Sequence, residues 1–373
     1  MKKLIYITPR KTNILSNFAN SKQIYNTCNE IGRLHDNFEV FFNRYNIISK
    51  EDFHSKIKEK YNEINFQVSS TYNYKFFWND FSYAIYVSFR YLFKNDIFFT
   101  RQDWIGLFLT LLGKKVYFEA HDFDSKRLCL RIMKKLITKK TNLNIIVISK
   151  ALKDEFRKHN FKNSINVIHD GVDLKKFVIK SKNEARIKLG IDLKDKVILY
   201  SGALRSGRGV MRLIEIARIT KDKKFYILGG RNKERLQYLK EKSKDLDNIF
   251  FKGYVSEFKL IDFMNAADIF LMPHQKHCDI IKYTSPLKMF EYLAMGKPIV
   301  ASDFPVFKEV LKDKNNSLLA KYDSAKDFSN KIHSLFQKNE LYDYISNNAI
   351  DSVIKYTWEA RAKNILEIIY EKN

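Results

Sequence analysis

The 373-residue sequence contains only three cysteines, five prolines and twelve glycines. The cysteines lie far apart and form no CxxC pair, which argues against a disulfide scaffold or a cysteine-based zinc module and favours a reducing compartment. The scarcity of proline and glycine excludes collagen-like and proline-rich low-complexity chains. Because 45% of the residues are apolar, the chain can bury cores of its own, and a mainly disordered protein is excluded as well.

Long apolar runs are also missing, since no stretch approaches the roughly 20 residues of a membrane-spanning helix. The apolar start at residues 4–7 is cut short by Pro9, Arg10 and Lys11, so it is too brief for the core of a signal peptide. We therefore expect a cytoplasmic protein, with peripheral contact at the inner face of the cell membrane left open.

Acidic residues are outnumbered, because 42 Asp and Glu stand against 67 Lys and Arg, which gives a net charge of +25. This excess favours an anionic partner: lipid headgroups, nucleic acid or phosphorylated small molecules. A compositional bias toward Lys, Asn, Ile and Phe is the alternative origin of the charge.

Short β-rich runs alternate with helical patterns through both halves, which is typical of parallel sheets with crossover helices. A polar stretch at residues 180–184 separates the two series, and a last helical run covers residues 359–370. The expected strands are residues 3–8, 38–42, 96–100, 115–119, 144–148 and 166–169 in the first half, and 196–200, 224–228, 248–251, 269–272, 298–301 and 317–320 in the second.

The predicted fold class is therefore α/β, with two Rossmann-like, doubly wound parallel-sheet domains facing one another across a cleft. We expect the first domain at residues 1–180 and the second at 181–356, with a C-terminal helix at about 357–373 packing back on the first. Open α/β sheets bind ligands at the carboxyl ends of their strands, so the turns after strands are the candidate sites.

Two of these turns suit a phosphorylated ligand. Residues 200–209 combine glycines with Arg205 and Arg208, so the backbone can approach a ligand while two guanidinium groups bind phosphate oxygens. In residues 283–296, Thr284 or Ser285 is expected to cap a helix that begins at Pro286. The free end of that helix is a pyrophosphate site. Each segment also has a purely structural interpretation. Residues 200–209 would be an ordinary glycine-rich turn with solvated arginines, and residues 283–296 would form a buried helix in which Glu291 has no role in binding.

The order of these motifs resembles the retaining GT-B glycosyltransferases of glycosyltransferase family 4, also described as glycosyl transferases group 1. The resemblance covers roughly residues 96–373 and is most specific at residues 285–303. The other matching stretches are residues 118–122, 147–150, 167–177, 200–209, 248–255 and 267–273.

The resemblance implies a role for each matching residue. Arg205, Arg208 and Lys288 would meet the donor diphosphate, Glu291 would hold the ribose, and His121 would face the transferred sugar. The implied catalytic residues are His121, Arg205, Arg208 and Lys288, and the implied donor-binding residues are Gly202, Gly253, Tyr254, Val255, Tyr283, Ser285, Leu287 and Glu291.

Two departures from the family pattern concern recognition of the sugars. The family's paired glutamates lie eight positions apart, whereas Tyr283 stands eight positions before Glu291. The turn after the first strand lacks the usual glycine-rich loop and has Pro9, Arg10 and Lys11 instead. Contacts to the donor sugar and to the acceptor are therefore expected to differ from those of the family.

The implied activity is transfer of a sugar from a UDP- or GDP-linked donor to a hydroxyl of a lipid-linked or cell-surface glycan, with retention and without a metal or other cofactor. His274, His277 and Cys278 supply only three ligands, so no metal site is predicted. The alternatives are a nucleic-acid-binding protein, including one that glucosylates DNA, and a relative without activity.

Two further segments bear on the acceptor. Residues 126–140 are typical of a basic amphipathic helix, which lies either on an anionic membrane surface or on its own sheet with solvated lysines. Upstream is an aromatic helical stretch, expected to be mostly core with a few rings left for a sugar or lipid. Its rings are Phe76, Phe77, Trp78, Phe81, Tyr83, Tyr86, Phe89, Tyr91 and Phe93.

Overall fold

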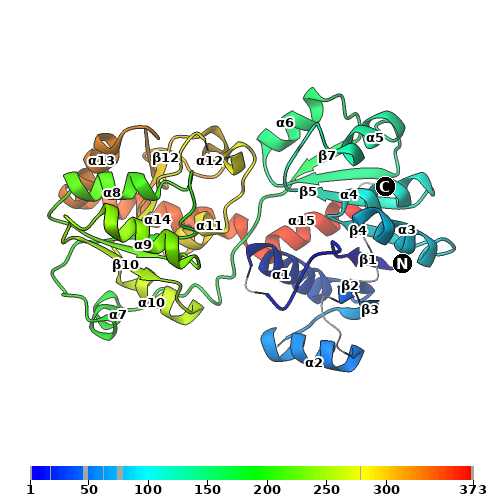
Figure 1. Ribbon diagram of the computed structural model, residues 1–373, viewed down its shortest axis with the longest axis horizontal. Helices are drawn as coiled ribbons and strands as arrows, with labels where there is room; N and C mark the ends of the chain where they lie inside the picture. Colours follow the sequence, from blue (N-terminus) through cyan, green and yellow to red (C-terminus); the bar gives the residue numbers. More distant parts are fainter. Residues whose placement is uncertain are drawn as a thin grey trace. The chain divides into compact units, whose positions relative to one another are not determined.

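The computed structural model describes residues 2–16, 18–44, 49–61, 63–73, 79–277 and 279–370, with the backbone alone for residues 44, 50, 72, 73, 279 and 280. The chain divides into two compact units (Figure 1). Unit 1 comprises residues 1–170 and 358–373, and unit 2 comprises residues 171–357.

Unit 1 is built on a seven-stranded sheet in the order β3-β2-β1-β4-β5-β6-β7, and its paired strands are parallel. The strands are β1 (Leu4–Ile7), β2 (Phe38–Arg44), β3 (Gln67–Asn73), β4 (Ile97–Thr100), β5 (Lys115–Ala120), β6 (Leu143–Val147) and β7 (Ser164–Val167). The helices are α1 (Ala19–Leu34), α2 (Lys50–Tyr61), α3 (Asp80–Arg90), α4 (Asp103–Leu111), α5 (Leu128–Leu136), α6 (Lys150–Lys158) and α15 (Trp358–Tyr370).

Helices pack on the faces of this sheet, so its central strands are apolar throughout. All four residues of β1 and of β4 are buried, as expected for parallel strands covered on both sides. The last helix of the chain, α15, packs against α1 within unit 1. The Tyr117 hydroxyl of β5 donates a hydrogen bond of 3.2 Å to the Ile368 carbonyl of α15.

Unit 2 contains a six-stranded parallel sheet in the order β10-β9-β8-β11-β12-β13. Its strands are β8 (Val197–Ser201), β9 (Lys224–Leu228), β10 (Ile249–Gly253), β11 (Ile269–Met272), β12 (Ile299–Ser302) and β13 (Leu318–Ala320). Its helices are α7 (Lys182–Leu189), α8 (Val210–Ile219), α9 (Lys233–Lys242), α10 (Glu257–Ala266), η2 (Asp279–Lys282), α11 (Leu287–Ala294), α12 (Pro305–Lys308), α13 (Ala325–Gln337), α14 (Asn339–Val353) and η3 (Ile354–Tyr356).

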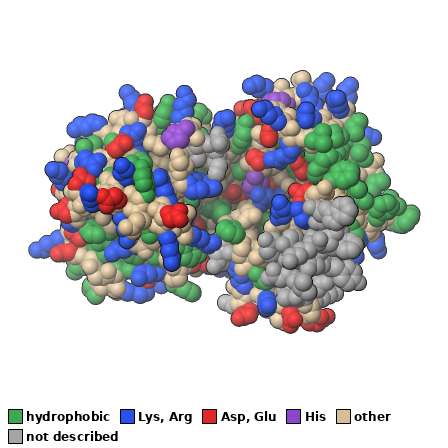
Figure 2. Space-filling model, viewed as in Figure 1, with side chains coloured by type: hydrophobic (Ala, Val, Ile, Leu, Met, Phe, Trp, Pro, Cys, Tyr) green, Lys and Arg blue, Asp and Glu red, His purple; other side chains and the backbone are tan. Residues whose placement is uncertain are grey.

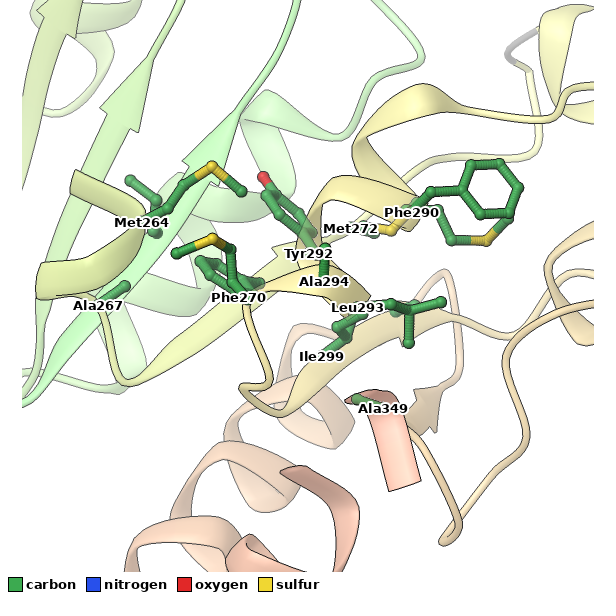
Figure 3. Close-up of a cluster of buried hydrophobic side chains, with 14 of the residues drawn as sticks. Met264, Ala267, Phe270, Met272, Phe290, Tyr292, Leu293, Ala294, Ile299 and Ala349 are labelled. Carbon is green, nitrogen blue, oxygen red and sulfur yellow. The ribbon is translucent and has the colours of Figure 1, made fainter. Parts of the chain in front are cut away.

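The core of unit 2 fixes α11 on the sheet. Figure 3 shows the buried face of α11, with Phe290, Tyr292 and Leu293, among side chains of the sheet and of α14. The rings of Tyr292 and Phe270 stack with centroids 4.3 Å apart and an interplanar angle of 11°. This packing sets the rotation of α11 and therefore which of its residues face away from the core.

The prediction of two Rossmann-like α/β domains with parallel sheets is confirmed, and each of the twelve predicted strands is present within two residues at either end. The sequence prediction missed β3, because the stretch QVSSTYN has little apolar character and lies at the edge of the sheet. The basic helix expected at residues 126–140 is shorter and covers only α5. Among the described residues, none of the helices has the length and apolar character needed to cross a bilayer.

Candidate active site

The strand order of unit 2 reverses between β8 and β11, because the chain adds β9 and β10 on one side of β8 and then β11, β12 and β13 on the other. At such a switch point the loops after two adjacent strands diverge and leave a crevice at their carboxyl ends. The loop after β8 contains Arg205 and Arg208, and the loop after β11 leads through η2 to the start of α11. Two predicted phosphate-binding turns therefore begin from adjacent strands.

Backbone hydrogen bonds hold the ends of β8, β9 and β10 together. The Gly202 N–H donates to the Leu228 carbonyl at 3.0 Å, and the Gly229 N–H donates to the Gly253 carbonyl at 2.7 Å. The Gly229 backbone has a φ of 121°, and a Cβ there would lie 1.9 Å from the Gly202 carbonyl oxygen. The close approach of these strand ends thus depends on a residue without a side chain.

The start of α8 is held equally closely to the loop after β11. Gly209 caps α8 with a φ of 81°. A Cβ at this position would lie 1.7 Å from the Pro273 carbonyl oxygen. The adjoining Gln275 N–H donates to the Gly207 carbonyl at 2.9 Å. The loop between β8 and α8, which contains Arg205 and Arg208, is therefore held at both of its ends.

We expect Gly209→Ala to lower the free energy of unfolding by more than about 2 kcal/mol, because left-handed backbone strain adds to a clash with Pro273. The matched control is Gly190→Ala in the same unit, where φ is 66° and no atom lies within 4 Å of the added Cβ. Gly190→Ala should lower the free energy of unfolding only by the left-handed backbone strain, about 1 kcal/mol. Thermal unfolding of both variants measures the difference, and equal losses would contradict the close-approach argument.

Arg208 is oriented by a histidine that the sequence interpretation assigned no role. Its Nη1 donates a hydrogen bond of 3.1 Å to Nε2 of His274. His274 is 5% exposed, and burial together with the Arg208 charge lowers its pKa to about 3. The imidazole is therefore neutral at physiological pH and can accept this bond. The Nε atom of Arg208 is buried and has no hydrogen-bond partner among the described residues, so the guanidinium retains capacity for an anion.

The start of α11 differs from the expected capping. The cap residue is Pro286, which precedes the first helical residue Leu287, and no side chain makes a capping hydrogen bond. The expected cap by Thr284 or Ser285 is therefore wrong, because the helix begins one residue later than the proline pattern indicated. An eight-residue helix without a side-chain cap presents first-turn N–H groups and the positive end of its dipole.

Lys288 and Glu291 are both half-buried and form an ion pair with one another on α11. The Lys288 ammonium lies 2.5 Å from a Glu291 carboxylate oxygen, and the side chains are 30% and 14% exposed. They are three residues apart, the spacing that places two side chains on one helix face. The two predicted donor-binding groups are thus held together, with the positive charge nearer the helix start.

Tyr292 connects α11 to the end of β8. Its hydroxyl accepts a hydrogen bond of 2.8 Å from the Ser201 N–H, and its ring is buried. The sequence analysis assigned Tyr292 no role, because no local signal distinguishes a tyrosine that anchors a strand end from one that fills a core. Tyr292 therefore positions the start of α11 relative to the loop after β8, which contains Arg205 and Arg208.

The end of β10 offers a flat aromatic surface. Tyr254 is 55% exposed, and the Arg231 guanidinium carbon lies 4.6 Å from the centroid of its ring. Val255 is half-buried and packs on the core. Arg231, which follows β9, is a neighbour that the motif search missed, because it lies outside each of the matched stretches.

The remaining predicted residues of unit 2 lie on the same strand-end loops. Arg205 is exposed, Ser285 is buried, and Tyr283 and Leu287 are half-buried. Among the described residues there is no group of three metal-ligating side chains. Cys278 lies outside the described residues.

His121 belongs to unit 1 and lines a polar pocket of about 270 Å³ there. The pocket lies at the switch point of that sheet, between β1 and β4. Lys11 follows β1, Arg101 follows β4, and His121 follows β5. The loop after β1 is fixed by Arg10, whose Nε donates to Asp80 at 2.9 Å. The unusual Pro-Arg-Lys sequence therefore forms a braced loop with Lys11 at the pocket.

A buried carboxylate organises this pocket. Glu119 is 1% exposed and contacts Nε2 of His121. Burial raises the pKa of Glu119, but the charges of Arg361 and Arg101 and the contact with His121 outweigh it and hold the pKa well below its usual range. Burial and Arg101 lower the pKa of His121, although Glu119 opposes them. A neutral His121 therefore donates from Nε2 and keeps Nδ1 as an acceptor.

Arg361 of α15 completes the base of the pocket. It is 2% exposed, and its Nη2 donates to Glu119 at 2.8 Å. Its Nη1 donates to the carbonyls of Ile168 and His169 at 2.8 and 2.7 Å. The C-terminal helix thus supports the site of unit 1, a role that no sequence motif indicated.

Comparison with known proteins agrees with this architecture. Residues 181–352 match the family described as glycosyl transferases group 1. An N,N'-diacetylbacillosaminyl-diphospho-undecaprenol alpha-1,3-N-acetylgalactosaminyltransferase of Campylobacter jejuni is 30% identical over 217 residues, which is 55% of this chain and 54% of that protein. A D-inositol 3-phosphate glycosyltransferase of Mycobacteroides abscessus is 23% identical over 208 residues, with 54% of this chain and 45% of that protein covered. The chain thus spans about half the length of these curated relatives.

Solved structures resemble the whole chain. A glycosyltransferase from Rickettsia africae aligns with a TM-score of 0.77 at 17% identity, over 99% of this chain and 98% of that one. Anabaena HepE in complex with UDP and glucose aligns with a TM-score of 0.73 at 14% identity, over 99% of both chains. At such identities the likeness concerns the fold alone, which is that of GT-B glycosyltransferases.

Proposed function

We propose that this chain is a retaining glycosyltransferase of the family 4 type, since residues 181–352 match the family described as glycosyl transferases group 1. It takes a UDP- or GDP-linked sugar as donor and a hydroxyl of a lipid-linked or cell-surface glycan as acceptor. The Campylobacter relative, whose name specifies a diphospho-undecaprenol-linked substrate, supports the lipid-linked class of acceptor.

The observation that carries this proposal is the Arg208–His274 pair at the switch point of unit 2. A neutral histidine holds the guanidinium without neutralising it, so the positive charge stays available for a diphosphate. Lys288 and the uncapped start of α11 add donors and positive potential on the neighbouring loop. Cationic side chains and helix N–H groups can stabilise the departing diphosphate without a bound metal.

In the proposed reaction the bond between the anomeric carbon and the diphosphate oxygen breaks as the acceptor oxygen bonds to the same face of that carbon. The acceptor proton passes to a phosphate oxygen of the leaving nucleoside diphosphate. Arg205, Arg208 and Lys288 offset the charge that develops on that group. In unit 1, the Nδ1 acceptor of His121 would bind a sugar hydroxyl.

The first test is thermal unfolding of the chain with UDP, GDP, UDP-sugars and GDP-sugars. A nucleotide present at 100 times its dissociation constant stabilises the folded state by about 2.7 kcal/mol. Release of nucleoside diphosphate is then followed with a polyprenyl-diphosphate-linked sugar as acceptor, and NMR of the product gives the anomeric configuration. Failure of every nucleotide to stabilise the chain would overturn the donor assignment, and an inverted product would overturn retention.

Glu291→Gln should weaken nucleotide binding by about 10-fold to 100-fold, because a carboxylate that accepts ribose hydroxyl bonds contributes roughly 1.5–3 kcal/mol. The matched control is Glu241→Gln, which removes the carboxylate of another i,i+3 pair, with Lys244 on the surface of unit 2. Calorimetric titration with the nucleotide that stabilises the wild type measures both variants. Equal nucleotide affinities of the two variants would exclude a role for Glu291 in donor binding.

A further inference from the structure

An exposed apolar groove lies between α3, α4 and α5 of unit 1. Its volume is about 760 Å³, and Figure 2 shows hydrophobic side chains gathered where Figure 1 places these helices. Phe81, Leu111, Leu128 and Leu136 line it and are between 42% and 56% exposed. A contiguous apolar surface of this kind marks a site of interaction with a partner or a membrane.

Helix α5 presents three different faces. At about 100° per residue, the buried Cys129 and Met133 face the core. Leu128, Ile132 and Leu136 form a second apolar face that lines the groove. The rest of the helix surface, next to this second apolar face, carries three cationic side chains. They are Arg131, Lys134 and Lys135, which are exposed and form no ion pair among the described residues.

The exposed charges of α5 beside the groove are positive, and the acidic residue that lines the groove, Asp80, pairs with Arg10 at 2.9 Å. Residues 126–140 contain seven Lys and Arg and no Asp or Glu. An exposed apolar face bordered by unpaired cations complements the interface of a membrane with anionic lipids, where apolar side chains enter the acyl boundary and cations meet the headgroups. A second copy of the chain fits less well, because a two-fold contact would bring the same cations of both copies together.

We propose that this groove and the cationic face of α5 dock unit 1 on an anionic membrane surface. The expectation that the aromatic stretch is mostly core is wrong for its described rings. Tyr83 and Tyr91 are buried and Tyr86 is half-buried, whereas Phe81, Phe89 and Phe93 are exposed, with Phe81 at the groove. The rings of Phe81 and Trp104 meet edge to face at 5.0 Å, which gives the groove a rigid aromatic wall. Phe76, Phe77 and Trp78 lie outside the described residues.

Docking would also place the polar pocket of unit 1 beside the bilayer. Arg127 and Leu130 line that pocket, while Leu128, between them in the sequence, lines the groove. A lipid-linked acceptor held in the membrane would then present its headgroup next to His121. This last point rests on the proposed function, whereas the docking itself needs neither donor nor acceptor.

Flotation of the full chain with vesicles tests the docking directly, with phosphatidylcholine alone in one arm and phosphatidylcholine plus phosphatidylglycerol in the other. We expect Lys134→Gln/Lys135→Gln to weaken binding to the anionic vesicles about thirtyfold, since each cation near the surface contributes roughly a factor of five. The control Lys240→Gln/Lys242→Gln removes the same charge from α9 and should change binding less than about threefold. This control separates local docking from the general effect of a net charge of +25.

The apolar contribution is tested with Leu128→Gln/Leu136→Gln, which should weaken binding about tenfold or more. The control is Ile187→Gln/Phe258→Gln, which replaces two exposed apolar residues of unit 2, 69% and 84% accessible. Raising the salt concentration to about 0.5 M should shrink the lysine effect and leave the leucine effect. Because all these side chains are exposed, thermal unfolding should be unchanged.

Three results would overturn the docking proposal. The first is equal binding to both kinds of vesicle. The second is equal loss in the groove variants and their controls. The third is a dimer in sedimentation velocity that the leucine variant dissociates, which would assign the groove to a second copy of the chain. Each differs from failure of the proposed function, because no nucleotide or acceptor is present in these assays.

Discussion

Arg208→Met should lower kcat by about 10²-fold to 10³-fold, the range seen when one charge-stabilising donor of an active site is removed. Arg208 is the arginine that the loop after β11 orients, through His274, at the switch point of unit 2. In the proposed reaction the charge on the leaving diphosphate exists fully only as the donor bond breaks, so the effect should fall on kcat more than on KM. Nucleoside diphosphate release with a saturating donor measures it.

Two further variants define how Arg208 acts. Arg208→Lys retains the charge but loses the planar fork, so we expect it to recover only part of the activity. His274→Phe removes the acceptor that orients the guanidinium and should lower kcat about tenfold, with a smaller effect on KM. The control is Arg218→Met on α8, whose guanidinium pairs with Asp245 on the surface of unit 2. If Arg208→Met retained the kcat of this control, the leaving-group role would be excluded.

Arg361→Met should lower the free energy of unfolding of unit 1 by about 3–5 kcal/mol, because it leaves the Glu119 carboxylate buried without its main cation. Both side chains are 1% exposed, so water cannot replace the lost partner. The three tryptophans of the sequence lie within the ranges of unit 1. Urea unfolding followed by tryptophan fluorescence therefore reports on this unit.

The matched control is Arg33→Met, which removes an exposed ion pair to the same helix, α15. Arg33 of α1 lies 3.0 Å from Glu359 of α15, and both side chains are at least 40% exposed. Its loss should cost less than about 1 kcal/mol. The double variant Glu119→Gln/Arg361→Met should recover part of the stability, since it removes the uncompensated charge. A loss in Arg361→Met no larger than in Arg33→Met would contradict the structural role of the buried pair.

The elements of the fold that could be predicted from the sequence are those that local residue patterns specify. Parallel strands buried on both faces form apolar runs, which is why LIYI at β1 and IFLM at β11 could be located from sequence. The sequence analysis missed strand β3 because it is polar and lies at the edge of the sheet. The cap of α11 was misplaced by one or two residues, at Ser285 or Thr284, because a proline suits both the cap and the first turn of a helix.

The candidate site was predictable only where a motif is continuous in the chain. Gly202, Arg205 and Arg208 follow one strand, and Lys288 and Glu291 lie on one helix turn. His274, Tyr292 and Arg231 were not assigned roles, because their partners come from other strand-end loops. Their contacts depend on which strands are neighbours in the sheet, and periodicity does not specify that order.

The sequence alone determined the alternation of strands and helices, the turns that carry cations and glycines, and the excess of positive charge, because each is set by residues adjacent in the chain. The tertiary structure decided which distant groups meet. Arg361 reaches Glu119 across 242 positions, Ser201 meets Tyr292 across 91, and Arg208 meets His274 across 66. Such pairs form when sheets and helices pack, because burial then leaves each polar group only the partners that the fold places beside it.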